Sequence, residues 1–305
     1  MDPEKAAAAS ADVTKIAFLG LGVMGYPMAG HLAAAGYPLR VYNRTQSKAA
    51  AFARQFGGKQ AATARDAAHG ASIVIACVGN DDDLRQVTLG DDGAFDAMGE
   101  GSIFVDHTTT SASIARTLYK EAGRRHCHFV DAPVSGGQTG AENGQLSVML
   151  GGDEAPIQTI RPVLDCYARV AERIGPAGSG QLTKMVNQIC IAGLLQALAE
   201  SLTFATAAGL DTRKVLKVIS KGAAQSWQMD NRAETMLRGE FDFGFAVDWM
   251  HKDLTYVLEE AGRNEVPLPV TQLVQQYYAD LQERGGGRWD TSSLIVRLDP
   301  GIPRQ

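Results

Sequence analysis

The segment Lys15-Ile16-Ala17-Phe18-Leu19-Gly20-Leu21-Gly22-Val23-Met24-Gly25 decides how the first half of this chain is interpreted. Its beginning is a short apolar run of the kind that forms a strand buried on both faces. Gly20 follows at once, and a helical pattern then continues to about Ala35, with Gly36 placed to cap its end. A strand, a glycine turn and a helix in direct succession are typical of the first unit of a parallel α/β sheet.

The glycines of this turn have the spacing of a dinucleotide-binding loop. Gly20 permits the tight turn, Gly22 lets a pyrophosphate approach the backbone, and Gly25 lets the helix pack closely against the sheet. The first N–H groups of the helix have no partners within it and are therefore available to phosphates. The sequence predicts cofactor contacts along the whole loop, at Gly20, Leu21, Gly22, Val23, Met24 and Gly25. The alternative is a glycine-rich turn that binds nothing.

The residues after the next expected strand indicate which dinucleotide binds. An NAD site usually holds an acidic residue about twenty positions after the glycines, where it binds the ribose hydroxyls. Here the chain has Asn43, Arg44 and Thr45 instead. Arg44 can pair with a 2′-phosphate, and Asn43 and Thr45 can donate hydrogen bonds to it. We therefore predict that NADP(H) is preferred over NAD(H); the alternative is a solvated loop arginine.

Short apolar runs and helical patterns alternate as far as residue 175. Further strands are expected at residues 39–42, 72–78, 102–106, 128–133, 146–150 and 169–174, and helices between most of them, as at 46–56 and 113–122. Such alternation implies right-handed crossovers and a mostly parallel sheet. The fold class predicted for this half is a Rossmann-type, doubly wound α/β domain.

From Gly178 onward the pattern is almost entirely helical. A long helix is expected from Gly180 to about Ala208, and shorter helices at residues 213–221, 233–237, 247–260 and 270–282. We therefore predict three parts: a tail over residues 1–13, an NADP-binding Rossmann-type domain over 14–177, and an all-α domain for substrate binding and oligomerisation over 178–305.

The composition excludes several classes of function. The chain has 305 residues, of which 45% are hydrophobic and 21% charged, and its formal net charge is -5. This mild acidity argues against nucleic acid or an anionic membrane as the main partner. No apolar run approaches the roughly 20 residues of a membrane span. Residues 1–10 lack the basic start and apolar core of a signal peptide, so a cytoplasmic location is expected.

Cysteine and histidine spacing gives no sign of a metal site. The four cysteines are widely separated, and we expect all four to be reduced thiols in the core. His126 and His128 are two residues apart, but no other ligand cluster accompanies them. No metal is therefore predicted.

Three more loops follow the ends of expected strands. In an open α/β sheet, such loops line the ligand crevice. Val78 and Gly79 follow one strand, and Thr109 follows another as a candidate hydroxyl donor, with helix capping as the alternative role. Residues 131–137 end a third strand with Ser135, Gly136 and Gly137. Consecutive small residues can present their N–H groups to a carboxylate, although taken alone this is a glycine-rich turn.

Four motifs in order carry a resemblance to a known family. They are residues 20–25, residues 131–137, residues 178–188, and the run Lys252-Asp253-Leu254. Together they resemble the β-hydroxyacid dehydrogenase family, which includes 3-hydroxyisobutyrate dehydrogenases, tartronate semialdehyde reductases and glyoxylate/succinic semialdehyde reductases. The resemblance covers about residues 14–298. It implies a Rossmann-type domain and an all-α domain joined by a long helix.

The resemblance also implies roles for individual residues. Lys184 corresponds to the catalytic lysine and Asn187 to the carboxamide that follows it. Ser135, Gly136 and Gly137 correspond to the turn that holds the substrate carboxylate. The remaining matches are Phe245 and Asp253 at the substrate, and Val78, Gly79, Thr109 and Lys252 near the cofactor. One position departs from the family, because many relatives have a second asparagine where this chain has Gln188.

The spacing of the long helix supports a catalytic role for its first turns. Positions i, i+3 and i+4 share one helix face, so Lys184, Asn187 and Gln188 should point together. Desolvation can lower the pKa of such a lysine. We expect protonated Lys184 to donate a proton to a carbonyl oxygen as hydride arrives from NADPH, and neutral Lys184 to accept it in reverse.

Two other functions are compatible with the same architecture. One is an imine reductase, although those enzymes usually replace the lysine. The other is a catalytically silent cofactor-binding scaffold, against which the retained Lys184 and the turn at Ser135–Gly137 argue. The family resemblance further implies a homodimer or homotetramer that acts on a small carboxylate.

Overall fold

The computed structural model describes residues 14–298, so the predicted tail at residues 1–13 lies outside the described residues. The described chain separates into two compact units, of which the first ends at Lys184 and the second begins at Met185. The first unit is built around a sheet and the second from helices. The predicted boundary at residue 178 marks the start of one long helix, and the units part within that helix.

One sheet organises the first unit. Its described strands are β1 (Ile16–Leu19), β2 (Leu39–Tyr42), β3 (Lys59–Gln60), β4 (Ile73–Ala76), β5 (Ile103–Asp106), β6 (His128–Asp131), β7 (Val134–Ser135), β8 (Leu146–Gly151) and β9 (Ala168–Gly175). Their order is β3-β2-β1-β4-β5-β6-β8-β7, and β9 pairs with β8. The strands from β3 to β6 run parallel, which confirms the predicted Rossmann-type fold class.

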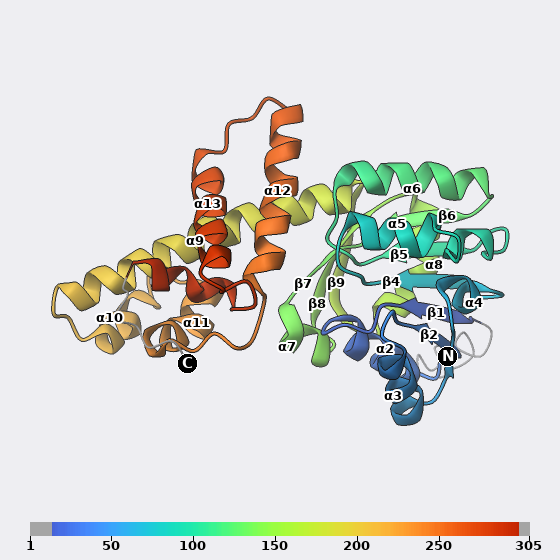
Figure 1. Cartoon of the computed structure of the whole chain (residues 1–305), viewed down its shortest axis with the longest axis horizontal. Coiled ribbons are helices and arrows are strands. Elements are labelled where there is room, and N and C mark those ends of the chain that lie inside the picture. The colour runs from blue at the N-terminus through green and yellow to red at the C-terminus, as the bar shows by residue number, and fades with distance from the viewer. Residues whose placement is uncertain (1–13, 299–305) are drawn as a thin grey trace. The chain divides into compact units, whose positions relative to one another are not determined.

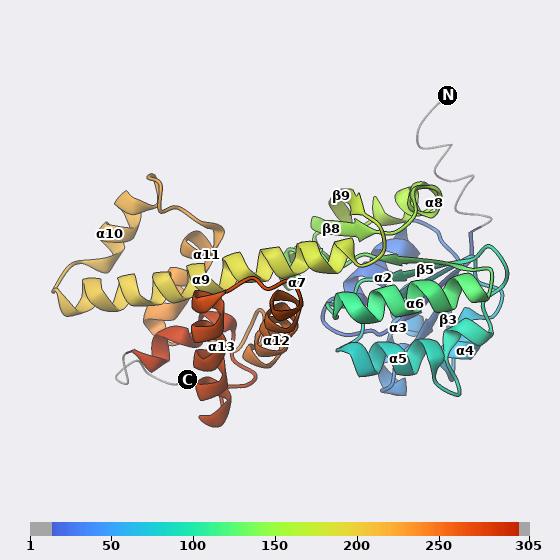
Figure 2. The same cartoon turned by 90° about the horizontal axis from the view of Figure 1, so that it is seen from above.

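Helices cover both faces of this sheet (Figure 1, Figure 2). They are α2 (Gly25–Ala34), α3 (Gln46–Phe56), α4 (Ala64–Ala68), α5 (Asp81–Leu89), α6 (Ala112–Arg124), α7 (Gly137–Glu142) and α8 (Glu154–Leu164), with the short η1 (Ala94–Asp96). Ile16 and Phe18 of β1 belong to the apolar core under α2, α3 and α8, whereas Ala17 and Leu19 belong to the core under α4, α5 and α6. The continuous apolar run of β1 therefore reflects burial on two faces.

The described second unit is helical, as predicted. It contains most of α9 (Ser179–Ala207), and then α10 (Thr212–Ile219), α11 (Trp227–Arg238), α12 (Val247–Arg263), α13 (Pro269–Glu283) and the 3-10 segment η2 (Thr291–Arg297). An isolated bridge between Ala246 and Asp290 is the β pairing described there. Helix α11 begins six residues before the predicted start, because Ser226 caps it by accepting a hydrogen bond from the Met229 N–H.

Helix α9 corrects two expectations from the sequence. It is long and apolar enough to meet the length and composition criteria of a membrane span. The expectation that no apolar segment approaches this length was therefore wrong. Core helices of water-soluble proteins meet the same criteria, and α9 carries Gln181, Lys184 and Gln188 in buried positions. The expectation of four core thiols was wrong for Cys190, which is exposed on this helix, although all four cysteines are free.

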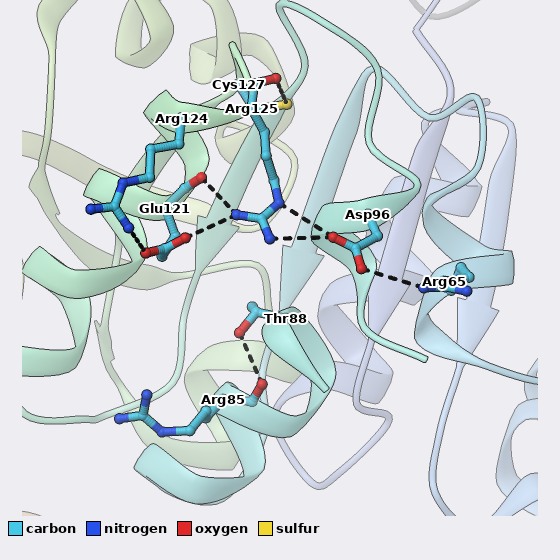
Figure 3. Close-up of polar contacts among 8 residues, drawn as sticks. All are labelled: Arg65, Arg85, Thr88, Asp96, Glu121, Arg124, Arg125 and Cys127. Atoms are coloured by element: carbon cyan, nitrogen blue, oxygen red, sulfur yellow. Dashed lines mark hydrogen bonds and ion pairs between the residues drawn. The ribbon is translucent and has the colours of Figure 1, made fainter. Parts of the chain in front are cut away.

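A chain of ion pairs joins three elements on the surface of the first unit (Figure 3). Arg125 contacts Asp96 of η1 at 3.3 Å and Glu121 of α6 at 3.0 Å, and Asp96 also pairs with Arg65 of α4 at 3.4 Å. Arg124 pairs with Glu121 from the other side. Because these side chains are solvated, each pair contributes only about 0–1 kcal/mol. The ion pairs therefore add little to the free energy of unfolding of this unit.

Asp106, at the carboxyl end of β5, is a fully buried acid. Its Oδ1 accepts a hydrogen bond from the Thr108 N–H at 2.9 Å, whereas its Oδ2 has no hydrogen-bond partner among the described residues. Burial raises the pKa of Asp106 to about 7, and the nearby carboxylates of Asp131 and Asp81 act in the same direction. The folded protein therefore holds a proton here at pH values where the unfolded chain has lost it.

This raised pKa makes Asp106 lower the free energy of unfolding as pH rises. The unfolded carboxyl ionises near pH 4 and the folded one near pH 7, so within that window the contribution falls by up to about 1.4 kcal/mol per pH unit. The variant Asp106→Asn lacks this proton. Its stability relative to the original protein should rise from pH 5 to pH 7 and then level off, measured by urea denaturation at each pH. A relative stability that is constant over that range would contradict the assignment.

Candidate functional site

Packing within the protein explains two of the three glycines in the turn after β1, and it does not explain the third. Gly20 has a φ of +96°, and a Cβ atom on it would lie 2.2 Å from the Cys77 carbonyl oxygen. A Cβ on Gly25 would lie 2.0 Å from the Gly20 carbonyl oxygen. A Cβ on Gly22, by contrast, would meet no atom within 4 Å. The fold thus explains the glycines at 20 and 25, and Gly22 leaves an open backbone surface of the kind a pyrophosphate needs.

Asn43 links this turn to the end of β2. Its Oδ1 accepts a hydrogen bond from the Leu21 N–H at 2.8 Å, and its Nδ2 donates to the Thr45 carbonyl oxygen at 3.0 Å. Its carboxamide therefore holds the two loops together. Arg44 is exposed, and its guanidinium pairs with Asp83 at 3.1 Å. Thr45 precedes α3, and its side chain makes no capping hydrogen bond to that helix.

The loops after β4 and β5 lie at the same edge of the sheet, because these strands pair in parallel. The Val78 N–H donates to the Thr108 Oγ1 at 3.0 Å. The Ser111 N–H and Oγ donate to the Asp81 carboxylate at 2.9 and 2.6 Å. Ser111 also caps α6, which leaves the half-buried Thr109 outside the capping role. The structure therefore brings the segments of Val78, Gly79 and Thr109 together beside the glycine turn.

The start of α9 is bonded to Asp131 at the end of β6. One carboxylate oxygen of Asp131 accepts from the Gly178 N–H at 2.7 Å, and the other accepts from the Gln181 N–H at 3.0 Å. These donors are among the N–H groups that a helix start leaves without partners, and a negative charge there is favoured by the helix dipole. Burial nevertheless raises the pKa of Asp131 to about 6. The Asp131 carboxylate is therefore still charged at neutral pH, and its hydrogen bonds connect the first turn of α9 to the sheet.

Gln181 makes a second connection that the sequence analysis missed. Its Nε2 donates to the Thr108 carbonyl oxygen at 2.7 Å, and its Oε1 accepts from the Thr110 N–H at 3.1 Å. The side chain is completely buried. Both bonds hold the loop that carries Thr109. The available signal was a polar residue at a core position of the helix, one turn before Lys184.

Lys184 lies one turn beyond this clamped start, on the same helix. Its side chain is only 8% exposed. The turn at Ser135–Gly137 connects β7, which ends at Ser135, to α7, which begins at Gly137, with φ values of +132° at Gly136 and +61° at Gly137. Gly136 and Gly137 are exposed, so an anion can reach the backbone of this turn.

The predicted residues of the second unit form a polar chain. Asn187 donates through Nδ2 to the Gln188 Oε1 at 2.8 Å, and Gln188 donates through Nε2 to the Asp253 Oδ2 at 2.6 Å. Lys252 pairs with the Asp253 Oδ1 at 3.1 Å and lies 5.1 Å from the centre of the Tyr256 ring. Gln188, predicted as catalytic, has both ends of its carboxamide engaged by protein groups.

Phe245 is held through its backbone. Its N–H donates to the Asp290 Oδ2 at 2.9 Å, and its carbonyl oxygen accepts from the Thr291 N–H at 2.9 Å. The ring is half-buried. Among residues 14–298, no group of three or more histidine, cysteine or acidic side chains is arranged to hold a metal ion.

Family models match both parts of the chain. Residues 15–178 match the NAD-binding domain of 6-phosphogluconate dehydrogenase. Residues 178–298 match the NAD-binding domain of NADP-dependent 3-hydroxyisobutyrate dehydrogenase. The two matches meet at the start of α9 and together cover almost the whole described chain.

Individual proteins agree with these matches. An uncharacterized oxidoreductase of Shewanella frigidimarina is 59% identical over 94% of this chain and 99% of its own length. A probable 3-hydroxyisobutyrate dehydrogenase-like protein of Arabidopsis thaliana is 40% identical over 94% of this chain and 85% of its own. The 2-hydroxy-3-oxopropionate reductase of Escherichia coli is 32% identical over 93% of this chain and 97% of its own length.

A solved structure has the same architecture. The 3-hydroxyisobutyrate dehydrogenase of Mycobacterium tuberculosis, solved with L-serine, superimposes with a TM-score of 0.85 at 29% identity, covering 93% of this chain and 99% of that one. Sequence motifs, glycine geometry, family models and relatives therefore lead to one conclusion: the chain belongs to the β-hydroxyacid dehydrogenase family and is an NAD(P)-dependent oxidoreductase.

Proposed function

We propose that this enzyme interconverts a small 3-hydroxy acid and its 3-oxo acid, with NADP(H) as the preferred cofactor and Lys184 as the general acid and base. The substrates in the names of two relatives share a skeleton. 3-Hydroxyisobutyrate and 2-hydroxy-3-oxopropionate are both C2-substituted propanoates that are oxidised or reduced at C3, with a methyl group on C2 in the first and a hydroxyl group in the second. We propose that skeleton as the substrate class.

The observation that carries this proposal is the placement of Lys184. A long amine side chain that is only 8% exposed lies one turn after a helix start held by Asp131 and Gln181. Burial of a lysine amine is costly unless other groups engage it, and lysines that act as acids and bases in catalysis are among those held in buried places. Because Asp131 and Gln181 hold the first turn of α9, the Lys184 amine has a defined position relative to the sheet edge where the cofactor loops lie.

The residues then have separate roles in the reaction. Bound NADPH supplies the hydride that reduces the aldehyde carbon. The protonated amine of Lys184 donates its proton to the carbonyl oxygen, which becomes the hydroxyl of the product, and neutral Lys184 accepts that proton in the oxidation. Ser135, Gly136 and Gly137 hold the substrate carboxylate through hydroxyl and N–H donors. Asn187 orients the reacting oxygen or the amine.

Substitution of Lys184 should stop the chemistry without stopping cofactor binding. Proton transfer by a positioned side chain typically contributes 10²–10⁴-fold, so Lys184→Ala should lower kcat/KM for 2-hydroxy-3-oxopropionate by about that factor. Lys184→Arg keeps the positive charge but cannot release a proton, and should fail in the same way. The measurement is NADPH consumption with folding and NADPH binding checked for each variant. A loss of less than tenfold would contradict the role of Lys184 as general acid and base. If the original enzyme reduced cyclic imines but no 3-oxo acid, the proposed substrate class would be wrong.

Three features of the β2–α3 loop support NADP(H) as the preferred cofactor. Arg44 is exposed, and its contact with Asp83 is a solvated ion pair that a phosphate can replace. Thr45 leaves its hydroxyl uncommitted to capping, and the first turn of α3 holds no acidic residue. The N–H groups of that turn favour an anion.

Reversal of the charge at Arg44 should reverse the cofactor preference. A charge-assisted hydrogen bond is worth about 1.5–3 kcal/mol, so Arg44→Asp should lower kcat/KM for NADPH by roughly tenfold to a hundredfold while sparing NADH. Arg54→Asp makes the same charge change at the exposed far end of α3 and serves as the control. If NADH is already the better cofactor of the original enzyme, the proposal fails.

We further propose that the protein is a homodimer or homotetramer associated through its helical unit. Helix α9 exposes a stripe of apolar and small residues at helical spacing, namely Val186, Cys190, Ala197, Ser201 and Phe204. Helix α10 has no buried residue although half its side chains are apolar. Exposed apolar side chains gathered along helices in this way are typical of an interaction site. A cytoplasmic location and the absence of nucleic acid and membrane partners stay predictions.

A charge on the stripe should dissociate the oligomer. Phe204 is 72% exposed within one chain, and a buried interface does not accommodate an unpaired carboxylate. Phe204→Glu should therefore lower the mass measured by sedimentation equilibrium, whereas Val266→Glu, at another exposed apolar position, should leave it unchanged. A monomeric original protein would overturn the proposal.

A further inference from the structure

We propose that Gln188 is a positioning residue that fixes the orientation of Asn187 by connecting it to Asp253. The inference rests on the proposed function, because it concerns how the site around Lys184 is arranged. It assigns to Gln188 a role other than contact with the substrate. The evidence is a chain of two side-chain hydrogen bonds within the helical unit.

The chain is short and buried. Asp253 is 2% exposed and Gln188 is 1% exposed. The Gln188 Nε2 lies 2.6 Å from the Asp253 Oδ2, and the Gln188 Oε1 lies 2.8 Å from the Asn187 Nδ2. The sulfur of Met250 lies 3.8 Å from the same Nε2 and closes its surroundings with an apolar group.

The chemistry of the groups fixes the direction of every bond. A carboxylate paired with Lys252 accepts hydrogen bonds and donates none, so Gln188 must turn its NH₂ group toward Asp253. Its oxygen must then point toward Asn187, which must turn its own NH₂ group toward Gln188. The two carboxamides cannot flip without placing two donors or two acceptors against each other. One charge thereby determines the orientation of Asn187.

This orientation matters for catalysis. With Nδ2 turned toward Gln188, Asn187 has its Oδ1 on the other side of the amide as an acceptor in a fixed direction. Lys184 lies three residues earlier on the same helix, a spacing at which side chains meet. A fixed acceptor suits the protonated amine or the hydroxyl of a 3-hydroxy acid. Gln188 therefore acts through Asn187.

The length of the glutamine side chain allows Gln188 to bond Asn187 and Asp253 at the same time. Adjacent residues of a helix do not face each other, so Gln188 must extend past its own turn to contact both Asn187 and Asp253. An asparagine at position 188 is one methylene shorter and would have to give up one of the two bonds. The departure from the commoner family pattern is thereby tied to a specific contact in this protein.

The variant Gln188→Glu tests the direction of the chain. The new carboxyl lies against Asp253, and two carboxylates at this distance share one proton. When protonated, the introduced carboxyl donates to Asp253 and accepts from Asn187, as glutamine does; when ionised, it repels Asp253. Lys252 is the charged group that contacts Asp253, at 3.1 Å, and it weakens that repulsion without changing its sign. We expect kcat within about threefold of the original enzyme at pH 5.5 and lower by more than tenfold at pH 8.5.

A matched control lies on the same helix. Gln196 is also buried, and its Nε2 donates to the Glu200 carboxylate at 2.7 Å. Gln196→Glu therefore also places two carboxyls together, eight residues, or about 12 Å, further along α9, although its partner Glu200 is exposed. It should reduce the free energy of unfolding as pH rises, as Gln188→Glu does, but leave kcat unchanged. The comparison separates an effect on stability from an effect on the site.

A double-mutant cycle tests whether Gln188 acts through Asn187. Gln188→Met should lower kcat at least tenfold with little change in the KM for NADPH, and should cost nothing further when Asn187 is already alanine. Equal losses in both backgrounds, or a pH-independent ratio of kcat between Gln188→Glu and the original enzyme, would overturn the proposal. Failure of the proposed function is distinguishable, because it leaves the original enzyme inactive toward 3-oxo acids while the pH-dependent loss of stability in Gln188→Glu is still measurable.

Discussion

The bonds between the Asp131 carboxylate and the first N–H groups of α9 are the constraint on which the site depends. They join the end of a sheet strand to the start of the helix that carries Lys184. Gln181 adds two bonds from the same turn to the loop of Thr109. Because carboxamide and carboxylate are both buried, water does not compete for these contacts. The backbone near Lys184 is thus fixed to the edge where the glycine turn and the cofactor loops lie.

The second unit uses the same device at a different place. There the buried carboxylate is Asp253, and the carboxamides of Gln188 and Asn187 extend from it in a fixed order. In the first unit the buried acid holds backbone N–H groups, and in the second unit it determines the direction of side-chain amides. Specific orientation, rather than net stability, is what such buried charges provide. This suits an enzyme in which a hydride and a proton must arrive on one carbonyl group.

Much of this was predictable from residues 15–25 and from hydrophobic periodicity. The strand Leu39–Tyr42 and the helix Gln46–Phe56 have the predicted bounds, because their apolar spacing is produced by burial on the sheet. The two-residue strands β3 and β7 and the five-residue helix α4 were not predicted, since tertiary contacts rather than pattern maintain such short elements. The helical position of Gln181 marks it as an unusual polar residue but does not indicate its role, because its partners are Thr108 and Thr110, some seventy residues earlier. The bond from Gln188 to Asp253, 65 residues later, is equally remote from its local sequence.

The most direct test of the proposed chemistry is where the hydride goes. 2-Hydroxy-3-oxopropionate is a tautomer of a 2-oxo acid, so reduction could in chemical principle take place at C3 or at C2. The enzyme should be supplied with NADPH deuterated at the transferring position, and the product analysed by NMR. A β-hydroxyacid dehydrogenase that uses Lys184 as described predicts deuterium on C3, and labelled product formed about 10²–10⁴-fold more slowly by Lys184→Ala. Deuterium on C2, or labelled product formed equally well by that variant, would contradict it.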